Sequence, residues 1–206
     1  MFRTLERVYL QIRGMKLFFL IPFAGYYILI PLVVWCLGKN TMGTGDALER
    51  VAEISYSLVP ILATWWNYMV HKEYVEGDGR EVLLLGGGVS TMTFLFYILN
   101  ILSFLPVFLF FHDMESGIMD LFLQMSLISF MTCGMAFFLT FMLKSISLSA
   151  LAVMAFCVLS NVSSERLQDY QFSMLRGNPE WFKDGELFLF AGIIFWIIGS
   201  VQAKKL

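Results

Sequence analysis

The run VSTMTFLFYILNILSFLPVFLFF, residues 89–111, contains no Asp, Glu, Lys or Arg. A helix needs roughly 20 consecutive apolar residues to cross a membrane, since each residue adds about 1.5 Å and the hydrocarbon layer is about 30 Å thick. This run is long enough to do so. We therefore predict a transmembrane helix from Val89 to Phe111.

The composition of the whole chain agrees with this prediction. Of its 206 residues, 58% are hydrophobic and only 15% are charged, and the mean hydropathy is +0.73. Soluble domains usually carry about 25% charged residues. Because little length remains outside the apolar runs, we predict a single transmembrane domain over 1–206, with no nucleotide-binding domain in this chain.

Five further apolar runs accompany residues 89–111. Together the six runs predict an all-α polytopic membrane protein with six transmembrane helices and short connections. The last two runs are short, so each is expected either to tilt into contacts with other helices or to be extended by less apolar flanks. The five runs are Leu17–Leu37, Val51–Val70, Ile118–Leu143, Ile146–Ser160 and Leu187–Val201.

Lysine and arginine are distributed unequally between the two sides that alternate along six spans. Nine fall on the side that holds both termini and five on the other side. Cytoplasmic loops carry an excess of Lys and Arg, so both termini are predicted to be cytoplasmic. Acidic residues are distributed in the opposite way, five inside and eleven outside, which makes the inner face positive and the outer face negative.

Residues 1–15 precede the first span and are predicted to form an amphipathic interfacial helix. Apolar side chains recur there at helical spacing, with cations off the apolar arc that would face anionic lipid. The alternative is an ordinary positively flanked leader to the first span. The apolar residues are Phe2, Leu5, Val8, Tyr9 and Ile12.

The polar segment HKEYVEGDGRE, residues 71–81, separates the second and third spans and belongs to a predicted cytoplasmic loop over 71–86. The glycines at 86–88 each cost a helix roughly 1 kcal/mol relative to alanine, so a break is expected there. Residues 79–85 would then form a short helix along the inner surface. The alternative is a plain solvated connection. On the outside, 161–186 is the longest predicted extracellular segment, and it could cap a cavity.

Trp65, Trp66 and Tyr68 cluster near the inner end of the second span. An aromatic belt at the membrane interface explains them, and contact with a substrate is the alternative. The three cysteines, Cys36, Cys133 and Cys157, all fall in apolar runs, where cysteine usually acts as a small buried hydrophobe.

Several catalytic and ion-coupling patterns are absent from the sequence. It has no Walker A loop, no His-x-x-x-His and no pair of adjacent glutamates within a span. His71 and His112 are expected in loops on opposite faces. Glu53 and Asp120 lie near the outer ends of their spans, where water reaches them. We therefore expect no catalytic residue, no metal site and no nucleic-acid partner.

Two cytoplasmic segments resemble the ABC-2 family of export permeases. The first contains Glu73, Gly77 and Glu81 followed by Leu83–Leu85, and it matches the Glu-x-x-x-Gly, acidic and Leu-rich pattern of that family. The family commonly continues into a proline-containing turn, where this chain has three glycines. The second segment, 143–147, is tight and singly basic, like the family's short second cytoplasmic loop. The six spans and the N-terminal helix extend the resemblance over the whole chain.

The resemblance implies a permease subunit of an ATP-driven exporter in the cell membrane. A cytosolic ABC ATPase would bind ATP and Mg²⁺, this chain would bind no cofactor, and a second permease subunit, identical or related, would complete the assembly among membrane lipids. The ATPase would be met by Glu73, Glu76, Gly77, Asp78, Arg80 and Glu81. Spans two and five would line the substrate pathway through Tyr56, Trp65, Asn67, Ser149 and Met154.

Thirteen methionines and twenty-one phenylalanines suit a hydrophobic or amphipathic cargo, lipid-like or peptide. Two other classes stay open at the level of sequence. One is a secondary transporter, and the other is a membrane anchor or sensor subunit, which would show no substrate-dependent ATP turnover.

Overall fold

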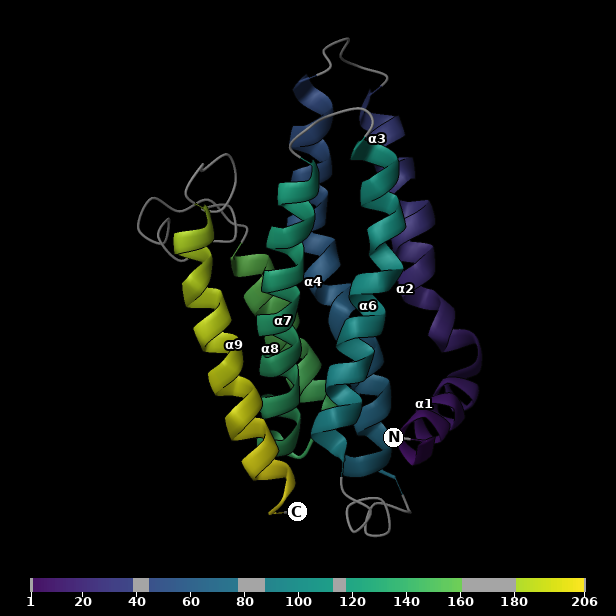
Figure 1. The fold of residues 1–206 in the computed structure, drawn as a ribbon, viewed down its shortest axis with the longest axis vertical. Coiled ribbons are helices and arrows are strands. Elements are labelled where there is room, and N and C mark those ends of the chain that lie inside the picture. Colours follow the sequence, from purple (N-terminus) through teal and green to yellow (C-terminus); the bar gives the residue numbers. More distant parts are fainter. Residues whose placement is uncertain (1, 39–44, 78–87, 113–117, 161–180, 206) are drawn as a thin grey trace.

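A computed structural model of the chain describes residues 2–38, 45–77, 88–112, 118–160 and 181–205. Within these ranges the chain forms helices joined by turns and contains no strand, which confirms the all-α prediction for this part of the chain. The helices run up and down in a bundle. Helix α1 and the end of α9 lie at the same end (Figure 1).

The N-terminal part of the chain is helical but irregular. At Lys16 the backbone adopts a φ of +49°, which is uncommon for a residue with a side chain, and helix α1 bends away from the rod that follows it (Figure 1). Pro22 and Pro31 cannot donate a backbone hydrogen bond, and short 3₁₀ and π turns alternate with α-helix around them. The elements are α1 (Phe2–Met15), η1 (Lys16–Leu20), α2 (Ile21–Ala24), η2 (Gly25–Leu29) and α3 (Ile30–Gly38).

Helix α4 (Gly45–Val75) is the longest described helix, and its 31 residues extend about 46 Å. It packs against α3, α6, α7 and α8. From residue 54 to residue 75 only Lys72 and Glu73 are exposed. Other helices therefore enclose most of α4.

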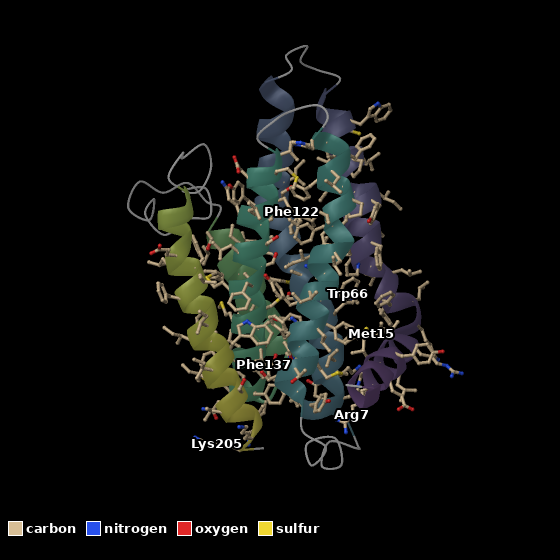
Figure 2. The ribbon with its side chains drawn as sticks, in the orientation of Figure 1. Arg7, Met15, Trp66, Phe122, Phe137 and Lys205 are labelled. Carbon is tan, nitrogen blue, oxygen red and sulfur yellow. The ribbon has the colours of Figure 1, made fainter. Side chains whose placement is uncertain are left out.

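The remaining helices complete the bundle around α4. They are α6 (Val89–His112), α7 (Ile118–Leu143), α8 (Ile146–Leu159) and α9 (Trp181–Ala203). Helix α7 is central, since it contacts α4, α6, α8 and α9. Trp66 of α4 and Phe137 of α7 lie between the helices (Figure 2) and are fully buried.

The described bundle is apolar on the outside and partly polar inside. Large hydrophobic side chains are exposed along its helices, as a lipid solvent favours, while amides and hydroxyls are buried. The exposed residues include Leu102 and Phe110 of α6, Leu151 and Val158 of α8, and Phe190, Ile194 and Ile197 of α9. The buried ones include Ser55, Thr64, Asn67, His71, Thr93, Asn100, Gln124, Ser129 and Ser149.

Four described helical segments are long and apolar enough to span a membrane: Glu6–Val33, Val89–His112, Ile118–Leu143 and Gly185–Ala203. Together with the apolar exterior they are consistent with a membrane protein. This is fewer than the six spans expected. Helix α8 has 14 residues and extends only about 21 Å. Helix α4 is long enough, but its buried polar residues make it less apolar than a helix that faces lipid.

Three local expectations were wrong. His71 lies inside α4 and is fully buried, not in a loop. Trp66 and Tyr68 are buried in the bundle, so they form no aromatic belt facing the headgroups. Cys36 is exposed, whereas Cys133 and Cys157 are buried as expected. For His71 the reason is that α4 continues about five residues beyond its apolar run. For the aromatic residues and Cys36, an apolar run does not show which face of its helix the neighbouring helices cover.

Candidate functional site

The end of α4 carries the first residues of the predicted cytoplasmic loop over 71–86, which the resemblance assigns to contact with the ATPase. Helix continues to Val75, so the loop predicted from His71 begins about five residues later. The backbone N–H of Glu76 still donates to the carbonyl of Lys72 at 2.9 Å. A Cβ atom at Gly77 would lie 2.5 Å from the Glu73 carbonyl oxygen, so this turn needs a glycine. Asp78, Arg80 and Glu81 lie outside the described residues, as does the predicted helix over 79–85.

Glu76 connects this turn to a distant part of the chain. Its carboxylate oxygen Oε1 accepts a hydrogen bond from the backbone N–H of Ile146 at 3.1 Å, across 70 residues of sequence. Ile146 is the first residue of α8. The first N–H groups of a helix lack partners within the helix, and the helix dipole favours an anion there. Glu76 thus joins the end of α4 to the start of α8.

The turn between α7 and α8 has a constrained geometry that presents this N–H group. Lys144 adopts a φ of +51°, and extended Ser145 forms the N-cap of α8. The Ser145 hydroxyl oxygen accepts from the N–H of Leu148 at 3.4 Å. Ser145 and Glu76 therefore satisfy two different N–H groups at one helix start. The two predicted cytoplasmic segments come together at the end where α1 lies.

The five predicted pathway residues have different surroundings. Tyr56 donates to Oε1 of Gln124, and Asn67 and Ser149 are fully buried within the chain. Trp65 is half-buried and donates to the carbonyl of Phe18 at 3.0 Å. Met154 of α8 is 41% exposed. Of the five, only Trp65 and Met154 reach the surface of the chain, and the pathway itself stays a prediction.

The sequence did not predict that His71 is an ionisable side chain buried within the bundle. Its Nε2 lies 2.9 Å from the Thr93 hydroxyl, whose single hydrogen is donated to the Val89 carbonyl at 2.9 Å. Nε2 must therefore be the donor, which leaves Nδ1 as an acceptor. Nδ1 is buried with no protein partner among the described residues. The rings of Phe137 and Phe141 pack 5.3 and 5.4 Å from the imidazole centre.

Two buried amides continue this polar interior. Asn100 accepts from the hydroxyl of Tyr26 at 2.8 Å, while its Nδ2 has no hydrogen bond within the described ranges. Asn67 lies beside the Cys133 thiol but makes no hydrogen bond of normal geometry there. Buried polar groups without partners are costly and usually few. The spacing of Asn67 and His71, four residues apart, was the sequence signal for a shared helix face.

The described residues contain no group of three or more His, Cys, Asp or Glu side chains that could hold a metal ion. Near the end of α4, burial raises the pKa of Tyr74 and the Arg7 guanidinium opposes that shift. Arg7 belongs to α1, so charge from the N-terminal helix acts on the end of α4. Arg7 lies at the same end of the bundle as Lys205 (Figure 2).

No family model matches this sequence, and comparison with curated proteins and with solved structures gives no match. The resemblance to ABC-2 permeases therefore stays a prediction. Of the residues that carry this resemblance, the structure describes Glu73, Gly77 and the segment 143–147.

Proposed function

We propose that this chain is the permease subunit of an ATP-driven exporter in the cell membrane. A separate cytosolic ATPase binds ATP and Mg²⁺, and a second permease subunit completes the transport unit. The cargo is hydrophobic or amphipathic, lipid-like or peptide. In this proposal α4 and α8 cross the membrane as well, within the bundle rather than facing lipid on all sides.

The hydrogen bond between Glu76 and Ile146 carries the proposal. A permease that hydrolyses no ATP must receive force through contact with its ATPase, and that force must reach the helices. A push on the end of α4 would be transmitted through Glu76 to the start of α8. Both helices belong to the pair that the resemblance assigns to the substrate pathway, so one docking event would move both.

Co-purification and ATP hydrolysis test the proposal. The tagged full chain, solubilised gently from its host, should bring down an ATPase subunit in stoichiometric amount. The double variant Glu73→Ala/Glu81→Ala should lower recovery of that subunit and ATP turnover by about tenfold, which corresponds to about 1.4 kcal/mol of docking energy. Insertion of the chain into the membrane should be unchanged.

A matched control removes two carboxylates far from the docking end. Asp120 is exposed near the start of α7, and Glu186 is exposed near the start of α9, away from the end of α4 and the turn between α7 and α8, so Asp120→Ala/Glu186→Ala should leave docking and turnover near wild type. Unchanged docking in the Glu73/Glu81 variant would reject the coupling assignment. Recovery of the chain with no ATPase would favour an anchor, a sensor subunit or a secondary transporter.

His71 supports a second candidate, a proton-coupled transporter. An ionisable side chain buried inside a membrane bundle often marks a proton pathway. The Nδ1 atom of His71 has no protein partner among the described residues, and it could accept a proton.

The variant His71→Phe separates this candidate from the first. A phenyl ring preserves packing against Phe137 and Phe141, and Thr93 keeps its bond to Val89, so the free energy of unfolding should change by about 1 kcal/mol or less. Under the second candidate, proton flux into proteoliposomes, followed with a pH-sensitive dye, should fall at least about tenfold. Equal proton flux in the variant and the wild type would remove this candidate.

A further inference from the structure

A groove of about 510 Å³ lies between α1 and the end of α4. Ligand-binding clefts commonly have volumes of about 300–1,000 Å³. Apolar side chains form most of its wall, and three polar side chains join them. The lining residues include Leu10, Gly14, Met15, Phe18, Lys72 and Glu73.

The apolar part of the groove opens toward the outside of the bundle. Leu10 is 55% exposed and Phe18 is 58% exposed, while Met15, which also lines the groove, is buried. Met15 lies where α1 meets the rest of the bundle (Figure 2). An apolar wall with an outward opening suits an acyl chain that enters from the lipid side.

The charged part of the groove has both signs. Lys72 and Glu73 are consecutive, exposed residues of α4, and both line the groove. A cation binds a phosphodiester, and a carboxylate binds an ammonium through charge-assisted hydrogen bonds. A lipid headgroup that carries both a phosphodiester and an ammonium would therefore match Lys72 and Glu73.

We propose that this groove binds a membrane phospholipid whose zwitterionic headgroup carries a primary ammonium, as in phosphatidylethanolamine. Lys72 binds the phosphate, Glu73 accepts from the ammonium, and an acyl chain lies along Leu10, Met15 and Phe18. Phosphatidylcholine lacks an N–H group for Glu73. Phosphatidylglycerol brings a negative charge without a cation, and Glu73 repels it. The bound lipid would fasten α1 to α4 immediately before Glu76.

Native mass spectrometry of the full chain in detergent tests this proposal. The probes are phosphatidylethanolamine, phosphatidylcholine and phosphatidylglycerol with identical acyl chains, added in equal amounts. The wild type should retain phosphatidylethanolamine preferentially. Glu73→Gln should lower that retention about tenfold, as expected when a hydrogen bond between charged groups is lost. The control Glu6→Gln removes an exposed carboxylate of α1 that does not line the groove, and it should leave retention unchanged.

A second pair of variants fills the groove. A Cβ atom at Gly14 would have nothing within 4 Å, and Gly14 lines the groove, so we expect a larger side chain there to occupy part of the groove. Gly14→Leu should abolish retention, whereas Gly14→Ala, which adds one methyl group, should preserve it. Thermal melting of both variants shows whether the fold is intact.

Three results would overturn the proposal. They are equal retention of the three lipids, unchanged retention in both Glu73→Gln and Gly14→Leu, and no lipid retained by the wild type. The last result would instead favour a protein segment as the occupant of the groove. Because the assay needs no ATPase and no ATP, its outcome is independent of the proposed exporter function.

Discussion

Replacing Gly192 with leucine is expected to prevent α9 from packing on α7. A Cβ atom at Gly192 would lie 2.7 Å from the ring of Phe130 and 3.2 Å from the backbone Cα of Met131. Even a methyl group must displace the ring, and a leucine must also move backbone. Overpacking of this kind costs about 1–3 kcal/mol for modest insertions, so we expect at least about 3 kcal/mol for leucine.

The measurement is the midpoint of thermal unfolding of the detergent-purified chain. It is monitored by heating samples to a series of temperatures and measuring the remaining monodisperse protein by size-exclusion chromatography. Gly192→Leu should lower the midpoint by about 10 °C or prevent purification of a monodisperse protein. Gly14→Leu is the matched control, because it introduces the same side chain at a helical glycine with open space around it. A midpoint for Gly192→Leu equal to that of the control would contradict the close approach of α7 and α9. The addition of Phe130→Ala should restore part of the loss.

Replacing Glu76 with alanine is expected to uncouple α4 from α8. The variant loses the acceptor for the Ile146 N–H, which lies 3.1 Å from the carboxylate, and it loses the charge near the helix start. Capping interactions contribute about 1 kcal/mol, so the midpoint of unfolding should fall by only a few degrees. ATP turnover of the complex with the proposed ATPase should fall much further, by about tenfold, because motion at the end of α4 no longer reaches α8.

Glu76→Gln separates the hydrogen bond from the charge. Glutamine keeps a carbonyl oxygen that can accept from Ile146, so turnover should lie between those of the wild type and Glu76→Ala. Ser145→Ala is the second control, since it removes the other cap of α8 and leaves Glu76 in place. If Ser145→Ala lowers turnover as much as Glu76→Ala, loss of α8 stability explains the effect, and the link through Glu76 does not.

The polar interior of the bundle bears on both candidate functions. Tyr26 with Asn100, Tyr56 with Gln124, and His71 with Thr93 form hydrogen bonds between different elements. Such pairs favour one arrangement of the helices, because hydrophobic burial distinguishes little between helix contacts inside lipid. The buried atoms without a described partner, including Nδ1 of His71, lie among them. If the helices moved during transport, these buried polar side chains would exchange hydrogen-bond partners with one another.

Several features follow from the sequence alone. Long runs without charge, such as residues 89–111, predict helices that can span a membrane, because the cost of unpaired backbone groups in lipid leaves the helix as the simplest solution. Helical spacing of apolar residues indicates the N-terminal helix, which is α1 in the structure. All these signals are local, so they can be read from consecutive residues.

Only the tertiary structure decided which helix is enclosed and which residues meet. Hydropathy treats a side chain facing lipid and one facing another helix alike, so it could not show that neighbours cover α4 or that His71 is buried among Phe137, Phe141 and Thr93. It could not pair Glu76 with Ile146 either, since 70 residues separate them. Contacts of this kind depend on how the faces of several helices are turned toward one another, and that is settled only when all of them pack together.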